Sequence, residues 1–488
     1  MEKSELKPAG VFHFFNEICQ VPRPSKKEEK MIAYLKAFGE KHNLETKVDE
    51  AGNVLIKKPA TPGKENLKTV ILQSHVDMVC EKNNDTDHDF LTDPIETEID
   101  GEWMKAKGTT LGADNGIGVA TELAILAYDS IEHGPIECLF TVDEETGLTG
   151  AFALKEGFMS GEILLNLDSE DEGELYIGCA GGIDTVAEFQ YENEMTPISH
   201  LCFRITVKGL KGGHSGGDIH LGRGNANKIL NRFLYQMMTT YQEDFHLYEF
   251  NGGNLRNAIP REASAVFSVP EHYKHDIRTA LNVFTAEIEN ELHRVEPDLN
   301  ILLETEPHRD WSIDSSTSYR LITSLYGCPH GVYAMSQDIP GLVETSTNLA
   351  SVKMKPNHII RIETSQRSSI LSARNDMANT VRAVFQLAGA DVTFGEGYPG
   401  WKPNPHSAIL EVAAESYKRL FGVEAKVKAI HAGLECGLFL DKYPTLDMIS
   451  FGPTLTGVHS PDERMHIPSV EKFWKHLLDI LAHVPAKK

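Results

Sequence analysis

Histidine and carboxylate side chains that could bind metal ions stand at the ends of apolar segments of this sequence rather than in one compact motif. An unpaired carboxylate at the end of a buried strand costs free energy, so it needs a partner. Two histidines and several carboxylates that converge could bind two divalent metal ions, as in a metal-dependent hydrolase. The candidates are His75 and Asp77 in SHVDM, Asp114 in TLGADNG, Glu144 and Glu145 in VDEETG, Asp168 in LLNLD and His459 in GVHSPDER.

The spacing of His75 and Asp77 favours cooperation between them. Residues two apart on a strand face the same side, so Asp77 can accept a hydrogen bond from the ring nitrogen of His75 that does not bind metal. Asp114 lies in a turn before an expected helix, where aspartate is most often an N-cap. A carboxylate has two oxygens, however, and can also bridge two metal ions. Each motif alone leaves a structural interpretation open.

Three acidic residues, Asp143, Glu144 and Glu145, follow an expected strand. Such close like charges repel one another unless a cation offsets them, although a solvated acidic turn is the alternative. Nothing in the spacing separates the role of Glu144 from that of Glu145. Asp168 could equally cap a turn, and His459 is one of 21 histidines. The metal site is therefore predicted from the shared location and chemistry of the whole set.

The composition limits the classes of function. At 488 residues the chain is too long for one compact core, so we expect two or more domains. Its net charge of −24 argues against nucleic-acid binding. The first residues lack a signal-type apolar stretch, and no run approaches about 18 uncharged apolar residues, which argues against a membrane partner. The seven cysteines are scattered and form no CxxC pair, which is typical of a reducing cytoplasm.

The elements that must position the candidates alternate between strand and helix. Residues 69–75, 136–142 and 162–168 are predicted strands, and 116–128 is a predicted helix between the first two. This alternation indicates an α/β sheet, in which functional residues gather at the carboxyl ends of strands.

An inserted domain is expected in the middle of the chain. The segment Gly395–Pro405 is dense in glycine and proline and predicts a boundary. His459 follows this boundary, whereas the other metal candidates precede residue 170. We therefore predict that 1–186 and 396–488 form one domain, interrupted by a second domain over 187–395 that is large enough for two small α/β units.

Six motifs in order along the chain resemble those of the di-zinc dipeptidase and aminoacylase superfamily, specifically its bacterial peptidase D branch of aminoacyl-histidine and cytosol non-specific dipeptidases. They are SHVDMV, KGTTLGADNGIG, FTVDEETGLTGA, LLNLDSEDEGELYIGCAGG, KGLKGGHSGGDIHLGRGNAN and GVHSPDERM. The resemblance implies a mixed-sheet α/β catalytic domain interrupted by an α+β lid domain, and a cytoplasmic dipeptidase of broad specificity that includes Xaa-His and carnosine-type dipeptides.

The resemblance also implies a role for each metal candidate. His75 and Asp168 would hold one Zn²⁺, Glu145 and His459 the other, and Asp114 would bridge both, with a cis peptide between Asp114 and Asn115. Co²⁺ or Mn²⁺ could substitute for Zn²⁺. Asp77 would orient His75. Glu144 would be the general base for a hydroxide that bridges the metals, and this choice over Glu145 comes from the family.

Further roles follow from the resemblance for residues of the inserted domain. His214 in GGHSGG would donate a hydrogen bond to the tetrahedral oxyanion, in some relatives from the partner subunit of a homodimer. A flexible glycine-rich loop is the alternative interpretation. Asn257 and Arg367 are candidates to bind the terminal carboxylate of the substrate, since arginine suits bidentate carboxylate binding, although many arginines simply lie on the surface.

Two other functions remain open at this point. An aminoacylase or carboxypeptidase-like amidohydrolase would act on N-blocked amino acids and would not recognise a free α-amine. A catalytically silent, metal-stabilised assembly protein would need no carboxylate beyond the metal ligands, yet Glu144, Asp77 and His214 are all present. The acidic composition favours neither nucleic acid nor membrane as a partner.

Overall fold

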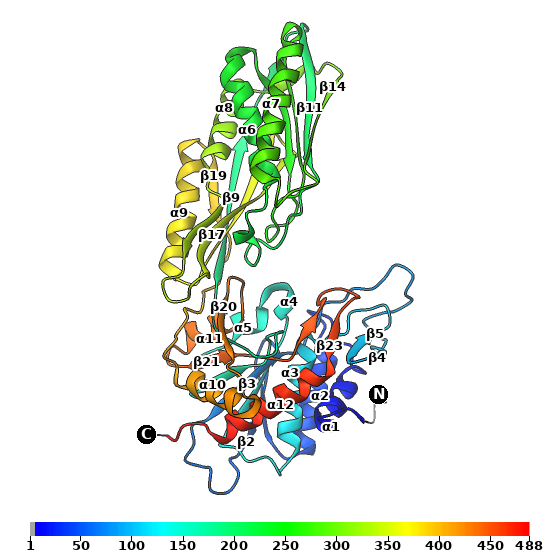
Figure 1. Ribbon diagram of the computed structural model, residues 1–488, viewed down its shortest axis with the longest axis vertical. Helices are drawn as coiled ribbons and strands as arrows, with labels where there is room; N and C mark the ends of the chain where they lie inside the picture. Colours follow the sequence, from blue (N-terminus) through cyan, green and yellow to red (C-terminus); the bar gives the residue numbers. More distant parts are fainter. Residues whose placement is uncertain (1–4, 488) are drawn as a thin grey trace. The chain divides into compact units, whose positions relative to one another are not determined.

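The computed structural model describes residues 5–487. The chain divides into two compact units (Figure 1). Unit 1 comprises residues up to Cys179, together with Trp401–Ala429 and the chain from Leu434 onward, and unit 2 comprises Ala180–Gly400 and Ile430–Gly433. The middle of the chain thus forms a different unit from its two ends. Unit 2 begins at Ala180, before the predicted residue 187, and its main segment ends at Gly400, after the predicted residue 395. The catalytic and lid roles of the two parts stay predictions.

Unit 1 is built on an eight-stranded mixed sheet. In spatial order its strands are β1 (Glu45–Val48), β2 (Val54–Lys58), β6 (Ile136–Thr141), β3 (Val70–His75), β7 (Ile163–Asn166), β21 (Asp447–Ser450), β8 (Glu174–Cys179) and β20 (Lys426–Ile430). The central strands β6, β3, β7 and β21 run parallel, whereas β1 with β2, β2 with β6 and β21 with β8 pair antiparallel. The parallel centre brings the carboxyl ends of four strands to one edge.

Three of the central strands, β3, β6 and β7, are buried along their whole length, which explains their mostly apolar sequences. Every residue of VILQSH in β3, IECLFT in β6 and ILLN in β7 is buried. Parallel strands covered on both faces have such nearly continuous apolar runs. The three predicted strands therefore correspond to real ones, each with ends within two residues of the prediction.

Helices cover this sheet, and Figure 1 shows the first and last parts of the chain together around it in blue to cyan and orange to red. They are α1 (Ala9–Ile18), α2 (Glu29–Lys41), α3 (Ala113–Ala127), α4 (Glu144–Gly147), α5 (Thr149–Ala153), α10 (Ala408–Phe421), α11 (Cys436–Lys442) and α12 (Ile467–Ala482). Helix α3 packs on α1 and β3, and α10 packs on α12 and β21. The acidic segment after β6 is thus a short helix rather than an open turn.

A small second sheet of unit 1 joins an early and a late segment. Its order is β22 (Leu455–Thr456), β23 (Arg464–His466), β5 (Trp103–Ala106) and β4 (Thr97–Asp100). Met465 of β23 pairs with Met104 of β5, and both side chains are fully buried. The segment that contains β4 and β5 therefore supports the hairpin β22–β23, whose loop carries His459.

Unit 2 is an α+β structure with one antiparallel sheet of nine strands. The strands are β14 (Asn300–Glu306), β11 (His200–Lys208), β13 (Ala263–Pro270), β12 (His246–Gly252), β17 (Val343–Lys355), β18 (Ile359–Ser368), β9 (Gly181–Gln190) and β19 (Asp391–Phe394), with β16 (Gly331–Met335) paired to β17. The expected pair of small units is thus one continuous sheet. A separate two-stranded antiparallel sheet pairs β10 (Asn193–Met195) with β15 (Trp311–Ile313).

Four helices bury the apolar face of this sheet. They are α6 (Ala226–Tyr241), α7 (Lys274–Leu292), α8 (Ser315–Gly327) and α9 (Leu371–Leu387). Phe233 of α6, Phe284 of α7 and Phe267 of β13 pack ring against ring in the common core. Asn225 begins α6 as its N-cap by accepting a hydrogen bond from the Lys228 N–H. Within residues 5–487, no helix is both long and apolar enough to cross a membrane.

Candidate metal centre

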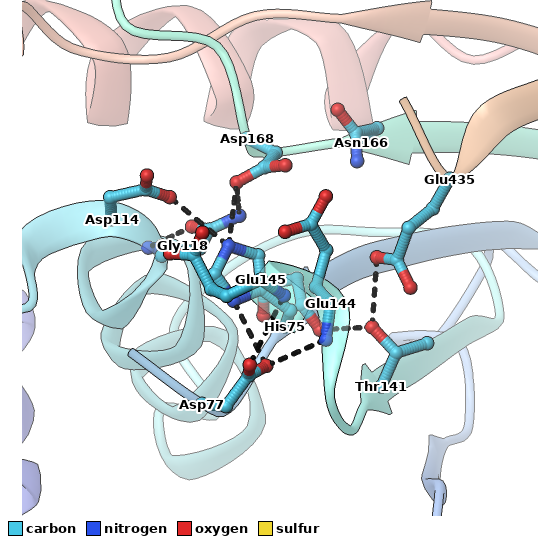
Figure 2. Close-up of polar contacts among 12 residues, drawn as sticks. His75, Asp77, Asp114, Gly118, Thr141, Glu144, Glu145, Asn166, Asp168 and Glu435 are labelled. Atoms are coloured by element: carbon cyan, nitrogen blue, oxygen red, sulfur yellow. Dashed lines mark hydrogen bonds and ion pairs between the residues drawn. The ribbon is translucent and has the colours of Figure 1, made fainter. Parts of the chain in front are cut away.

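The predicted metal residues all lie in unit 1, around the carboxyl ends of the central strands. They are His75 at the end of β3, Asp77 two residues later, Asp114 at the start of α3, Glu144 and Glu145 in α4 after β6, Asp168 two residues after β7, and His459 in the loop between β22 and β23. Parallel strands place their carboxyl ends at one edge, so residues distant in sequence meet there. Figure 2 shows most of this cluster.

Asp114 is the centre of the cluster because each of its oxygens faces a different histidine. Its Oδ1 lies 3.0 Å from His75 Nε2, and its Oδ2 lies 3.1 Å from His459 Nε2. Asp168 Oδ1 is 3.3 Å from His75 Nε2, and Glu145 Oε2 is 3.0 Å from His459 Nε2. The structure therefore groups one histidine and one carboxylate on each side of a shared aspartate.

The start of α3 is irregular where it carries Asp114. Gly112 precedes the helix with a positive φ of 67°, and Asp114 and Asn115 have non-helical backbone angles. The Asp114-Asn115 peptide is cis, as the family resemblance implied. Asn115 accepts from the Gly118 N–H at 3.1 Å and donates to Asp168 Oδ1 at 2.5 Å. Asn115, and not Asp114, therefore provides the side-chain cap of this helix.

Asp77 lies beneath His75 and is fully buried. Its Oδ1 is 3.3 Å from His75 Nδ1, while the backbone N–H groups of Glu144 and Glu145 donate to its two oxygens at 3.0 and 3.2 Å. Ser25 Oγ donates a further hydrogen bond at 2.7 Å. Burial raises the pKa of Asp77, but the bond and the charge of His75 and the other donors outweigh it and hold the pKa below its usual range. Asp77 thus ties His75 to α4.

Ion pairing raises the pKa of both histidines. Burial lowers the pKa of His75, but the neighbouring carboxylates outweigh it and hold the value well above the usual one. Hydrogen bonds to Asp114 and Glu145 raise the pKa of His459 to about 11. Burial raises the pKa of Asp114, yet its bonds to both histidines hold it below the usual range. The cluster therefore requires positive charge among its carboxylates.

Burial raises the pKa of Glu144 well above its usual value, and the nearby Asp168, Glu145 and Glu435 add to this effect against the charge of His75. Burial also raises the pKa of Asp168 to about 6, and the charges of Asp114 and Glu145 add to this effect against the charge and the hydrogen bond of His75. Carboxylates that cannot all be ionised next to one another are a common mark of a catalytic or metal site.

The donor set fits divalent metal ions. The Oε1 atom of Glu145 is buried and has no hydrogen-bond partner, and a buried oxygen without a partner is costly unless it has a ligand. Ligand atoms of His75, Asp114 and Glu145 all lie within 4.8 Å of one another. Imidazole nitrogens and carboxylate oxygens together are ligands that suit Zn²⁺ and related ions.

A buried polar network that the sequence did not reveal lies next to these residues. Glu435, 1% exposed, accepts a hydrogen bond from Gln73 Nε2 at 2.6 Å. It accepts another from Thr141 Oγ1 at 2.9 Å, which Figure 2 shows. Asn166 Nδ2 donates to Gln73 Oε1 at 2.5 Å. Burial raises the pKa of Glu435 to about 8. The polar residues Gln73 and Asn166 inside otherwise apolar strands were the signal that could have indicated this network.

In unit 2 the structure brings His214 and Arg367 together. Arg367 Nη2 lies 3.5 Å from His214 Nε2, and the guanidinium also donates to Tyr398 Oη at 3.0 Å and to Ser215 Oγ at 3.4 Å. Asn257 joins this group only through its backbone, since its carbonyl accepts from the Ser215 N–H at 2.8 Å while its side chain is exposed. Tyr398 and Ser215 are neighbours that the sequence did not indicate.

The charge state of His214 follows from these contacts. Burial and the charge of Arg367 lower the pKa of His214 to about 4, so its ring is neutral near pH 7. Its Nδ1 accepts from the Gly217 N–H at 2.9 Å, which leaves the proton on Nε2. Arg367 is 7% exposed and, among the described residues, forms no ion pair with a carboxylate. Two donors that face the same space favour an anionic ligand.

Comparison with known proteins identifies relatives over the whole length. The model of the family described as "Peptidase family M20/M25/M40" matches residues 71–483. The cytosol non-specific dipeptidase of Escherichia coli (strain K12) is 45% identical over 486 residues, which cover 100% of both chains.

Solved structures agree with this finding. The crystal structure of aminoacylhistidine dipeptidase from Vibrio alginolyticus has a TM-score of 0.92 and 46% identity, covering 100% of this chain and 99% of that one. A tripeptidase from Staphylococcus aureus shares the fold at a TM-score of 0.57 and 18% identity, covering 98% of this chain and 99% of that one.

Proposed function

Because this chain belongs to peptidase family M20/M25/M40, we propose that it is a metal-dependent dipeptidase whose reaction takes place at the cluster around Asp114. The observation that carries this proposal is the pair of contacts from one aspartate to His75 and His459 at 3.0 and 3.1 Å. A carboxylate shared in this way between two imidazole groups is suited to bridge two metal ions.

Two divalent ions complete the site in this proposal. His75 and Asp168 would hold one of them, Glu145 and His459 would hold the other, and Asp114 would be the ligand that they share. We assign Zn²⁺ because its usual ligands are imidazole and carboxylate, and Co²⁺ or Mn²⁺ can occupy the same ligands. When bound, the ions polarise the scissile carbonyl and lower the pKa of water. Asp77 keeps the Nε2 atom of His75 directed toward the site.

Glu144 is the general base in this mechanism. Figure 2 shows its carboxyl group directed toward Asp168, beside the candidate ligands. Glu144 takes a proton from the attacking water as the C–O bond forms. It then delivers that proton to the leaving nitrogen as the C–N bond breaks, which releases an amine and a carboxylate. With two divalent ions bound at the ligands, the ionised form of Glu144 would be favoured, which opposes the rise of its pKa by burial.

The residues of unit 2 recognise the substrate. The neutral His214 donates a hydrogen bond from its Nε2–H group to the tetrahedral oxyanion. Arg367 binds the terminal carboxylate of the dipeptide, which provides the negative charge that its present partners lack. We retain Asn257 as a substrate contact on the strength of its backbone bond to the Ser215 segment. The substrates are dipeptides of broad sequence, with Xaa-His and carnosine-type peptides among them.

A homodimer in the cytoplasm is the form we propose. Val332, Tyr333 and Met335 of β16 are 39%, 61% and 47% exposed. Among the described strands β16 pairs only with β17, so one of its edges is open. An exposed apolar edge strand favours association with another chain. Light scattering of the purified protein measures this directly, and a monomer at working concentration would refute it.

The first test of the function is the choice between free and N-blocked substrates. We expect the purified protein with Zn²⁺ to hydrolyse a panel of dipeptides, including Xaa-His, faster than their N-acetylated forms. Preference for the acetylated peptides would instead identify an aminoacylase. No turnover of either set would favour the metal-stabilised assembly protein.

The second test is Glu144→Gln, which removes the base and keeps the side-chain size. We expect kcat to fall by about 10²- to 10⁴-fold, because a general base contributes about that much, while both metal ions stay bound. Glu162→Gln at the opposite end of β7 is the matched control, since Glu162 forms a surface ion pair with Lys68 away from the metal candidates. A Glu144→Gln variant with both metals and full rate would show that another group is the base.

A further inference from the structure

Glu463 has an unusual set of partners for a buried carboxylate. It is 2% exposed and accepts hydrogen bonds from four consecutive backbone N–H groups. Leu111 and Gly112 donate to Oε2 at 2.7 and 2.9 Å, and Ala113 and Asp114 donate to Oε1 at 2.8 and 3.3 Å. Among the described residues, no lysine or arginine forms an ion pair with it. Backbone dipoles alone therefore compensate this charge.

The four donors belong to the loop that presents Asp114. The loop folds around the carboxylate because Gly112 adopts a left-handed backbone with φ 67°. A Cβ atom at Gly112 would lie 2.5 Å from Arg23 Nη2 and 2.8 Å from Met78 Sδ, so only glycine fits. From the other side, Arg23 Nη2 donates to the Gly112 carbonyl at 2.5 Å. The loop is thus held between a carboxylate that binds its N–H groups and a guanidinium that binds its carbonyl.

Glu463 also belongs to the loop that presents His459. Its own N–H donates to the Ser460 carbonyl at 3.0 Å, which closes the turn directly after His459. His459 has a positive φ of 63°, and its Nε2 is 3.1 Å from Asp114 Oδ2. The side chain of Glu463 therefore connects the two loops whose ligands must meet.

We propose that Glu463 is a positioning residue that fixes Asp114 against His459 so that the aspartate can bridge two metal ions. The inference rests on the proposed function, since it concerns the same metal centre. Asp114 has to present one oxygen to each side, and a shift of its backbone would leave one side without its shared ligand. The carboxylate of Glu463 determines that backbone through four bonds, and it does so from the chain segment that supplies the ligand on the second side.

The variant Glu463→Gln tests this proposal, with Glu137→Gln as its matched control. Glu137 is also 2% exposed and accepts from the N–H groups of Ser160 and Gly161 at 2.8 and 3.1 Å, but it lies on β6 at the far end of the sheet from the metal candidates. Both substitutions replace a buried carboxylate bound to backbone N–H groups by an amide, and Glu137→Gln in addition removes an ion pair with Lys57 at 2.9 Å. Both are therefore expected to lower the thermal stability.

The readouts are the affinity for each of two metal equivalents, kcat and KM for a dipeptide, and the magnetic coupling of the Co²⁺-substituted protein. We expect Glu463→Gln to lower the affinity for the second metal ion by about 10- to 100-fold, because substitution of groups that orient metal ligands typically has an effect of this size. It should also lower kcat more than it raises KM, and reduce the coupling between two Co²⁺ ions. Glu137→Gln should match the wild type in all of these except stability.

Glu463→Asp keeps the charge and decides the matter if Glu463→Gln does not fold, because a shorter carboxylate should recover part of the second metal equivalent. The inference is wrong if a folded Glu463 variant binds both metals as the wild type does, or if the two Gln variants lose metal and rate equally. Failure of the proposed function would look different, since the wild type itself would then bind no metal pair or hydrolyse no dipeptide.

Discussion

Asp114 divides its two oxygens between His75 and His459, and this single side chain lies at the centre of five candidate ligands that come from five parts of the chain. Its carboxylate accepts from both imidazoles and is anionic for that reason. The buried and unpartnered Glu145 Oε1 next to it shows that protein groups alone do not satisfy the cluster. At the scale of residues, the cluster has the composition and the unmet polarity of a metal centre.

The link between Asp77 and His75 leads to a prediction about metal affinity. Asp77→Asn places an amide where the N–H groups of Glu144 and Glu145 donate, so the group that orients His75 is lost. We expect the metal affinity and the rate to fall by about 10- to 100-fold. Asp49→Asn is the control, because Asp49 also accepts three backbone N–H bonds, from Ala51, Gly52 and Asn53, in a different loop. Metal titration followed by calorimetry measures the effect, and equal losses in both variants would contradict it.

Arg367 leads to a prediction about substrate recognition. A charge-assisted hydrogen bond contributes about 1.5–3 kcal/mol, and its loss weakens binding by roughly 10- to 100-fold. We therefore expect Arg367→Ala to raise KM for dipeptides by about that factor. The wild type should discriminate against dipeptide amides, which lack the terminal charge, and the variant should not. Arg361→Ala on the same strand is the control, because Arg361 is paired with Glu188 and Glu363. Unchanged discrimination in Arg367→Ala would show that another group binds the carboxylate.

Residue types at strand ends predicted that His75, Asp77, Asp114, Glu144, Glu145, Asp168 and His459 would gather in one place, and the structure brings them together. The choice of Glu145 over Glu144 as a ligand came from the family resemblance. Neither Glu435 nor Glu463 could be found in this way. Their partners are Gln73, Thr141 and the N–H groups of the loop before α3, which are hundreds of residues away in sequence. A carboxylate that binds backbone N–H groups has no distinctive sequence context, so only the folded chain reveals it.

At the scale of elements, the three parallel strands β3, β6 and β7 position the site, and their apolar sequences predicted them because both faces are covered. The start of α3 differed from its prediction. The irregular backbone at Asp114 and Asn115 is joined to the helix, and the true cap belongs to Asn115. Helix periodicity carries no information on such a distorted first turn.

The contact between α10 and α12 leads to a prediction about acid stability. His476 of α12 is 3% exposed, donates to the Ala413 carbonyl at 2.8 Å, and has its pKa lowered to about 4 by burial. A histidine whose folded pKa is below the unfolded value adds stability above about pH 6.5, and this stability is lost as the pH falls toward 4. The loss over that window is on the order of 3 kcal/mol.

His476→Phe should reduce that acid sensitivity, because the ring packing on Tyr417 and Phe451 remains while the titrating group is gone. Urea unfolding at pH 7 and pH 5 measures it. We expect the variant to be less stable than the wild type at pH 7 and to lose less stability at pH 5. If the free energy of unfolding of the variant fell between pH 7 and pH 5 by as much as that of the wild type, His476 would not be the source of the acid sensitivity.

At the scale of the whole molecule, the chain is two units, and the sequence indicated the separation better than its limits. The chain passes from one unit to the other at 179/180 and at 400/401, the latter inside the predicted boundary segment Gly395–Pro405, and the short return Ile430–Gly433 adds two further crossings. The nine-stranded sheet of unit 2 was also missed, because the long antiparallel pairing of β17 with β18 and of β18 with β9 depends on contacts that alternation within one strand does not reveal.

The most direct test of the account is a titration of metal-free protein with Zn²⁺ while dipeptide hydrolysis and bound metal are followed together. We predict that the metal-free protein is inactive, that it binds two ions per chain, and that activity reaches its maximum with the second equivalent. An Asp114→Ala variant should bind the pair far more weakly. Full activity without metal, or saturation at one ion per chain with full rate, would contradict the central claim that Asp114 bridges two catalytic metal ions.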